Sequence, residues 1–206
     1  MQTLFLVVGY AVYAGLAVIA LWGAFCVVLV WRRVASVRFR DEEELDAFIE
    51  AVDEPISSQR YDEAIELCDD DRRAMPQLAL YAIANRDQGA ARLERQVAER
   101  FQLDVMSDID HRLSWVSTVI KSAPMIGLLG TVIGMMGAFA NLSTGTKVDT
   151  GKMAEDIMFA LITTACGLAI AVPLLLLREG INVRIRKMED LVTAGVSQLL
   201  ESLGLR

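Results

Sequence analysis

Three long stretches without a charged residue are the feature that most constrains this chain. They cover residues 3–31, 122–146 and 157–177. A helix needs about 20 apolar residues to cross the hydrocarbon core of a bilayer, and each stretch is long enough. Hydrophobic residues make up 54% of the 206 residues, and the excess is concentrated in these stretches. The sequence therefore predicts an all-α, three-span membrane protein embedded in a lipid bilayer.

The basic residues near the span ends predict the orientation. Arg32 and Arg33 follow the first stretch, and Arg178 ends the third. The segment between the second and third spans carries only two lysines. Because Lys and Arg gather on the cytoplasmic side, the N-terminus is expected to be periplasmic and the C-terminus cytoplasmic. The first stretch is too long for a signal-peptide core and has no basic start, so we expect it to be retained.

These boundaries divide the chain into six predicted segments. In order they are transmembrane helix 1 (1–31), a cytoplasmic acidic helical domain (32–113), transmembrane helix 2 (114–142), a short periplasmic loop (143–154), transmembrane helix 3 (155–177) and a cytoplasmic C-terminal helix (178–206).

The predicted cytoplasmic domain is strongly acidic. Residues 41–112 hold 20 of the 27 acidic residues and only 8 arginines. This charge argues against binding of nucleic acid or anionic lipid, because both are negatively charged. Apolar residues recur at helical spacing within it, so we expect short amphipathic helices with a solvated acidic surface.

The residue types that carry most enzyme chemistry are scarce. Cys26, Cys68 and Cys166 form no CxxC motif, and His111 is the one histidine. The sequence offers no nucleophile–base pair and no cluster with metal-ligand spacing. We therefore expect a protein that is not an enzyme and that needs no metal or cofactor.

Two spans carry a face of small residues at helical spacing. Such faces allow close approach of helices in lipid, where little hydrophobic force acts between them. The predicted packing face of span two consists of Ala123, Gly127, Gly130, Gly134 and Gly137, and continues to Asn141. That of span three consists of Ala160, Gly167 and Ala171, with Thr164 between them.

A hydroxyl lies in the middle of each of these two spans, whereas no charged residue does. Thr131 is in span two, and Thr164 with its neighbour Thr163 is in span three. One interpretation is a packing helix in which each threonine bonds to its own backbone. The other is a pore lining that completes a path with a buried acid from another chain.

Two acids and an amide lie where spans two and three approach the predicted periplasmic side. Asn141, Glu155 and Asp156 are candidates for an outer mouth that attracts cations. The alternative is that Glu155 and Asp156 occupy the first turn of the third helix, where the helix dipole favours carboxylates.

The segments GLLGTVIGMM in span two and ALITTACGLAIAVP in span three resemble the two signature segments of the ExbB/TolQ/MotA proton-channel family. The three-span layout resembles the ExbB/TolQ branch rather than the four-span MotA branch. The resemblance implies an inner-membrane stator, a pentamer around a pair of helices from an ExbD/TolR-like single-span partner with a membrane-embedded Asp. Proton flow down the proton-motive force would then drive a TonB/TolA-like energy transducer, as in biopolymer and protein transport. By position, Thr131 and Thr164 resemble the pore threonines.

One position departs from the resemblance. Many ExbB and TolQ proteins have a Glu five residues before the threonine of span three, where this chain has Phe159.

The main rival to the stator is an oligomeric membrane scaffold that conducts nothing, and a membrane enzyme is a third hypothesis. The driven machine, and the choice between proton and sodium, stay open at this level.

Overall fold

The computed structural model describes residues 2–69, 71–143 and 150–204, with side chains described from residue 7 onward except for 141–143. The helices are α1 (Gln2–Val37), α2 (Glu42–Ser57), α3 (Tyr61–Asp69), α4 (Ala74–Ala84), the 3₁₀ segment η1 (Arg86–Gln88), α5 (Ala90–Phe101), the π segment η2 (Gln102–Met106), α6 (Ser107–Ser143) and α7 (Thr150–Ser202). These described residues contain no strand, and the prediction of an all-α fold is confirmed.

Three helices, α1, α6 and α7, are long and apolar enough to cross a membrane. Within the ranges that the structure describes, no other helix meets both conditions. The prediction of three spans is thus confirmed, and the chain is a multi-pass membrane protein.

The chain divides into two compact units. We call residues 1–28 and 113–179 the membrane unit, and residues 29–112 and 180–206 the acidic unit. Helices α1, α6 and α7 contribute residues to both, whereas α2 to α5 belong to the acidic unit alone.

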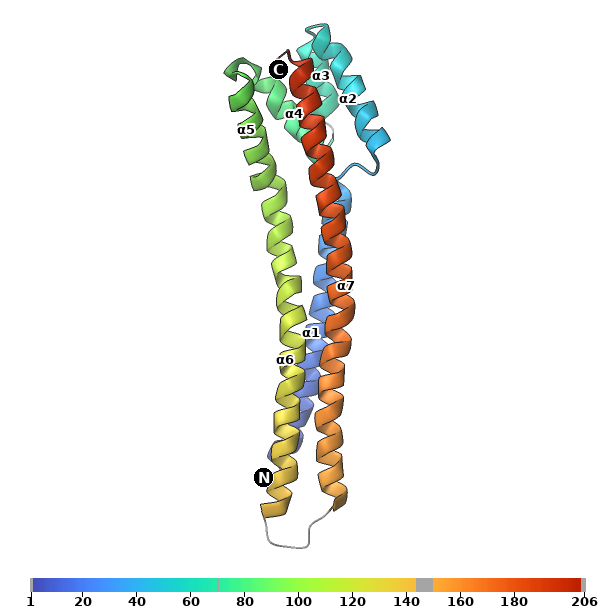
Figure 1. Ribbon diagram of the computed structural model, residues 1–206, viewed down its shortest axis with the longest axis vertical. Coiled ribbons are helices and arrows are strands. Elements are labelled where there is room, and N and C mark those ends of the chain that lie inside the picture. The colour runs from blue at the N-terminus through green and yellow to red at the C-terminus, as the bar shows by residue number, and fades with distance from the viewer. Residues whose placement is uncertain (1, 70, 144–149, 205–206) are drawn as a thin grey trace. The chain divides into compact units, whose positions relative to one another are not determined.

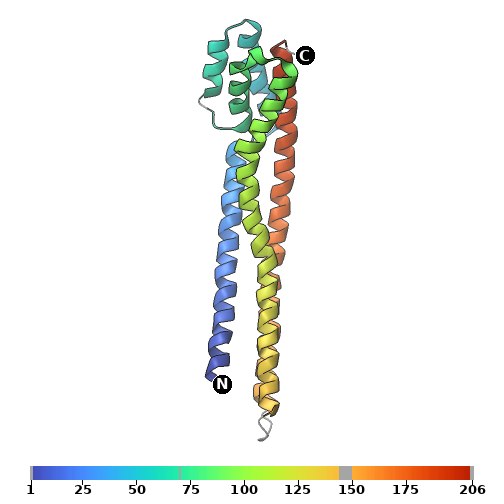
Figure 2. The ribbon, with the colours of Figure 1, turned by 90° about the vertical axis from the view of Figure 1, so that its left-hand side faces the viewer.

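Within the membrane unit, parts of α1, α6 and α7 lie side by side (Figures 1 and 2). Gly23 of α1 contacts Leu174 of α7 and Val119 of α6 closely. The outer faces of these helices expose large apolar side chains, among them Leu21, Met125, Leu128, Phe139, Leu161 and Leu176. Such faces are suited to lipid, because water would make their exposure costly.

The acidic unit has its own apolar core. Helix α2 buries one face and exposes its acids, and α4 is almost wholly apolar. Pro76 is the third residue of α4, where its missing N–H costs no hydrogen bond. Gly195 of α7 approaches both Ile49 of α2 and Met75 of α4, so the last part of α7 packs against these helices.

Arg73 ties three parts of the acidic unit together. Its Nη1 lies 2.5 Å from Glu44 Oε1, and its Nη2 lies 2.5 Å from Asp71 Oδ2. Its guanidinium carbon also lies 3.9 Å from the ring centroid of Phe39, a buried residue of the linker after α1. Burial raises the pKa of Asp71, but hydrogen bonds from the Arg73 side chain and backbone lower that pKa by more.

A second ionic cluster links α1 to α6. Asp108 accepts hydrogen bonds of 2.9 Å from Nε of Arg33 and from Nε of Arg112. Burial raises the pKa of Asp108, and the two guanidinium groups more than reverse that effect, so its pKa lies below the ordinary value. Arg33, Asp108 and Arg112 all belong to the acidic unit, so the cluster joins the last turns of α1 to the first turns of α6 within that unit.

Two local features differ from the sequence prediction. Helix α7 begins at Thr150, five residues before the predicted start at residue 155. Glu155 and Asp156 are therefore beyond the first turn, where the helix dipole would act on them most strongly. The helix before span two is also interrupted by the π segment η2, for which the apolar periodicity gave no signal.

Candidate functional site

The two small-residue faces pack against each other along the contact between α6 and α7. A methyl group placed on Gly127 would lie 2.8 Å from the carbonyl oxygen of Thr163. One placed on Gly134 would lie 2.9 Å from Cβ of Ala160, and one on Gly167 would lie 2.6 Å from the carbonyl oxygen of Ala123. Since real Cβ atoms do not approach so closely, only glycine fits at these positions. We call this contact the α6–α7 seam.

The small residues of the α6–α7 seam pack within the single chain. Ala123, Ala160 and Ala171 are at most 6% exposed, so the faces are used within one chain. Thr131 and Thr164, at the edge of the seam, keep part of their surface exposed.

Thr131 and Thr164 face each other across the seam, and their hydroxyls hydrogen bond to each other. Thr131 Oγ1 also lies 3.3 Å from the Gly127 carbonyl oxygen and 3.2 Å from the Ala160 carbonyl oxygen. Thr164 Oγ1 reaches the same two carbonyls at 3.2 and 3.4 Å. Both threonines are partly buried. We call these two hydroxyls and two carbonyls the threonine cluster.

The threonine cluster has more acceptors than donors. The hydroxyl protons of Thr131 and Thr164 serve two hydroxyl oxygens and two carbonyl oxygens. Because the Ala160 carbonyl also accepts from the Thr163 hydroxyl, the acceptor capacity left over lies mainly on the two hydroxyl oxygens. A donor such as water or a protonated carboxyl group fits this imbalance. A hydroxyl can also turn and donate to an ionised carboxylate, so both protonation states of an acid could be accommodated.

Thr163 occupies a different position from its neighbour. Its side chain is completely buried and lies directly against Gly130. Its hydroxyl donates to the Ala160 carbonyl oxygen at 2.9 Å. Thr163 therefore fills the seam and exposes no surface of its own in the single chain.

The candidates for an outer mouth do not behave alike. Asn141 belongs to α6, but its side chain lies outside the described residues. Glu155 is exposed, whereas Asp156 is partly buried. The Asp156 carboxylate lies over Gly137, with Oδ2 3.2 Å from the place of a Cβ. Phe159 faces α1 instead, with its ring 5.3 Å from that of Tyr13 and its edge near Gly9.

Sequence reasoning placed the threonines in the spans but did not pair them. The structure adds two backbone acceptors, the carbonyls of Gly127 and Ala160. A signal was present in the spacing, since each threonine follows a small residue by four positions. That spacing allows a threonine to bond to its own helix and leaves the carbonyl open to a neighbour.

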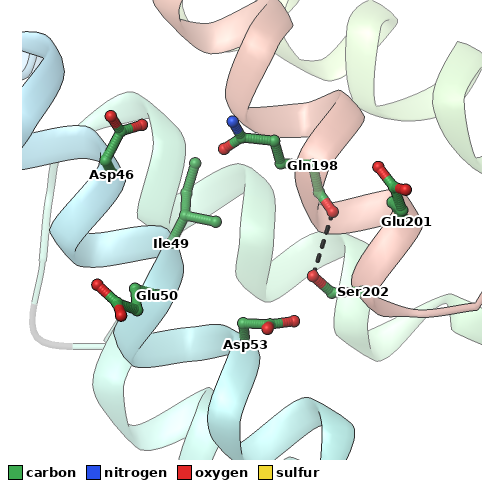
Figure 3. A pocket seen from close by; sticks show the side chains of 7 residues that line it. All are labelled: Asp46, Ile49, Glu50, Asp53, Gln198, Glu201 and Ser202. Carbon is green, nitrogen blue, oxygen red and sulfur yellow. Dashed lines mark hydrogen bonds between the residues drawn. The ribbon is translucent and has the colours of Figure 1, made fainter.

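The acidic unit offers a second candidate, an open pocket of about 590 Å³ between α2 and α7. Figure 3 shows its lining side chains, of which four are carboxylates: Asp46, Glu50, Asp53 and Glu201. Ser202 donates to the backbone carbonyl oxygen of Gln198 at 3.2 Å. Among the residues that the structure describes, no group of three or more His, Cys, Asp or Glu is placed to hold a metal ion. The four carboxylates give this open pocket an acidic lining.

Comparison with known proteins gives a family for this arrangement. Residues 72–193, more than half of the chain, match the family described as the MotA/TolQ/ExbB proton channel family. The matched region contains the whole α6–α7 seam and the threonine cluster.

Individual relatives are similar over a shorter region. The chain is 45% identical over 87 residues to a protein of Methanothermobacter thermautotrophicus described as a biopolymer transport ExbB homolog, covering 42% of this chain and 30% of the relative. An ExbB-like biopolymer transport protein of Helicobacter pylori is 40% identical over 82 residues, 40% of this chain and 53% of the relative. The Tol-Pal system protein TolQ of Haemophilus influenzae is 34% identical over 85 residues, 41% of this chain and 37% of TolQ.

These alignments span at most about half the length of the relatives. The family match, the ExbB and TolQ relatives and the three apolar helices agree with one another. The chain therefore belongs to the MotA/TolQ/ExbB proton channel family, in its ExbB/TolQ-like branch.

Proposed function

We propose that this chain is the channel subunit of an inner-membrane stator. Together with an ExbD/TolR-like single-span partner it conducts protons down the proton-motive force. The movement drives a TonB/TolA-like energy transducer that acts on the cell envelope. The observation that carries the proposal is the threonine cluster, a polar group in the middle of two otherwise apolar helices.

The proton carrier in this proposal is supplied by the partner. No Asp, Glu, Lys or Arg occurs in the spans between residues 122 and 146 or between 157 and 177. A proton path through a membrane usually needs an ionisable group, so the acid must come from another chain. Thr131 and Thr164 are partly exposed, and a helix bearing an Asp could place its carboxyl group beside them.

The threonine cluster suits both states of that carboxyl group. A protonated carboxyl can donate to a free acceptor of the cluster, and an ionised one can accept from a rotated hydroxyl. Exchange between these states requires only hydroxyl rotation, because the helices are held together by the close packing of the seam. The cluster would thus let the acid load and release a proton without exposing it to lipid.

The same chemistry favours protons over sodium. A sodium ion would need several more oxygen ligands than the two hydroxyls can offer, since the two carbonyls already accept from them. A proton on a carboxyl needs a single acceptor.

The assembly proposed is a pentamer around two partner helices, with a periplasmic N-terminus and a cytoplasmic C-terminus. The end of the seam near Asn141, Glu155 and Asp156 would then be the outer mouth. The acidic unit would lie in the cytoplasm, where its charge keeps it off anionic membrane surfaces.

The rival is a scaffold that oligomerises through its glycine faces and conducts nothing. What favours the stator over this rival is that Gly127, Gly134 and Gly167 pack against the chain's own helices.

Native mass spectrometry of the complex purified from membranes tests the assembly. The chain would be co-expressed with the proteins encoded beside its gene. Five copies with two copies of a small, single-span, Asp-bearing protein would support the stator. A homo-oligomer that never retains such a partner would contradict it, because residues 122–146 and 157–177 hold no acid that could carry a proton through the middle of the membrane.

A further inference from the structure

We infer that Asp156 is the proton-uptake carboxylate of this channel, the group that takes protons from the surface and passes them on toward the partner's carboxyl group beside the threonine cluster. This inference rests on the proposed function and assigns one residue of the outer mouth to a step. Glu155, its neighbour in the sequence, has no such role.

The position of Asp156 on α7 is the first argument. Asp156, Ala160 and Thr164 follow one another at intervals of four residues, so they share one face of the helix. That face is the one packed against α6, since the backbone oxygen of Asp156 lies 2.7 Å from the place of a Cβ on Gly134. Asp156 therefore stands in line with the threonine cluster, about 12 Å away along the helix axis.

The contact with Gly137 is the second argument. The Asp156 Cγ and Oδ2 atoms both lie 3.2 Å, and Oδ1 3.4 Å, from an ideal Cβ on Gly137. The whole carboxylate thus lies over a glycine of α6, and a Cβ at position 137 would press against it. The side chain is partly buried as a result, whereas that of Glu155 is exposed.

The distribution of acids in the membrane unit is the third argument. Among its described residues the carboxylates are Glu155, Asp156 and Glu179, and Glu179 lies 23 residues further along α7. Glu155 points away from the seam, as its exposure shows. In the part of this unit that the structure describes, Asp156 is thus the one carboxylate set into the seam.

The step is a simple proton exchange. The Asp156 carboxylate accepts a proton from a hydronium ion, which leaves as water. The protonated group then gives this proton to a water molecule or to the ionised carboxyl group of the partner helix. Asp156 returns to its ionised state, and no other reactant is consumed. A fixed negative charge at a mouth also raises the local cation concentration, by about tenfold or more.

Proton flux into vesicles tests the inference. The complex of the chain and its single-span partner is reconstituted into proteoliposomes that contain a pH-sensitive dye. Flux is compared for wild type, Asp156→Asn, Asp156→Glu, Glu155→Gln and Thr131→Val. Asparagine keeps the shape and the contact with Gly137 but removes the charge, whereas glutamate keeps the charge, so the two variants separate a role of the carboxylate charge from a role in packing. Assembly and unfolding temperature are measured for every variant.

The inference expects Asp156→Asn to lower flux about tenfold with normal assembly, Asp156→Glu to recover most of it, and Glu155→Gln to lose clearly less. Equal losses for Asp156→Asn and Glu155→Gln would overturn it, and so would an unchanged flux in Asp156→Asn. If Thr131→Val still loses flux in either of these cases, the proposed function stands. A wild-type complex that conducts no better than empty vesicles would refute both the inference and the proposed function.

Discussion

The hydroxyls of Thr131 and Thr164 hydrogen bond to each other from two different helices, and each also reaches the carbonyls of Gly127 and Ala160. This is possible only because α6 and α7 approach closely over glycine. The close packing of the α6–α7 seam therefore sets the distances between the hydroxyls and carbonyls of the threonine cluster.

Replacement of Gly127 by alanine tests the close packing of α6 against α7. The new methyl group would lie 2.8 Å from the Thr163 carbonyl oxygen, and backbone cannot move aside as a flexible side chain can. We expect a loss of about 1–3 kcal/mol in stability, measured as a lower unfolding temperature in detergent.

Gly15→Ala is the matched control for that experiment. Gly15 is also inside a membrane helix, but no atom lies within 4 Å of the place of its Cβ. Alanine there should leave the unfolding temperature unchanged or raise it, because it favours the helix by up to about 1 kcal/mol. Similar destabilisation by both substitutions would show that the α6–α7 contact is not as close as described.

Replacement of Arg73 by methionine tests the junction in the acidic unit. The change removes the ion pairs with Glu44 and Asp71 and the cation on the Phe39 ring, but keeps most of the apolar stem. We expect a loss of about 2 kcal/mol, seen in denaturant unfolding followed by circular dichroism.

Arg60→Met is the comparison, since Arg60 pairs with Glu63 in an exposed setting, with 49% and 55% of their side chains accessible. Exposed pairs are worth about 0.5 kcal/mol or less. If Arg73→Met and Arg60→Met lower the free energy of unfolding equally, Arg73 does not join the linker and the helices as described.

Stability should fall as the medium becomes acidic. The pKa values of Asp71 and Asp108 are lowered in the folded state, so both carboxylates stabilise the fold above their ordinary pKa. This contribution is lost as pH falls through the folded pKa, with the decline beginning below about pH 5.

Unfolding temperature measured between pH 7 and pH 3 would show this decline. An Asp71→Asn, Asp108→Asn double variant should be less stable at pH 7 and should lose less on acidification. A variant with the same pH profile as wild type would mean that other groups control the acid response.

Cys68 should be chemically inert in the folded protein. It is completely buried on α3, and burial first, with the nearby Asp71 charge second, raises the pKa of its thiol to about 11. Because the thiolate is the reactive form, maleimide labelling at pH 7 should be very slow in a Cys26→Ser, Cys166→Ser background. Fast labelling without denaturant would show that α3 opens readily.

The fold was largely predictable because its main cause is simple. In a bilayer the backbone N–H and C=O groups must hydrogen bond within the protein, and an apolar stretch of about 20 residues or more achieves this as a helix. The charge-free residues 3–31, 122–146 and 157–177 therefore predicted the three spans. Small residues at spacings of three and four likewise predicted which helix faces pack closely.

The sequence did not predict which helix covers each small-residue face. Periodicity marks a face of a helix but does not say which helix covers it, so the direct contact of Gly130 with Thr163 was not foreseen. The threonine cluster depends on the relative height of α6 and α7, which only three-dimensional packing sets. The π segment η2 has no apolar period of its own, and the early start of α7 lies in a polar stretch that was assigned to a loop.

The most direct measurement of the central claim is proton flux through the reconstituted complex with valine at Thr131 and Thr164. Valine keeps the branched shape of threonine but puts a methyl group in place of the hydroxyl, so assembly is measured for every variant. Thr118→Val is the control, because its exposed hydroxyl bonds to the Ser114 carbonyl oxygen on its own helix, away from the seam. The account predicts normal assembly in all variants, wild-type flux in the control, and a loss of about a hundredfold when both seam hydroxyls are removed. Wild-type flux in the Thr131→Val, Thr164→Val variant would contradict it.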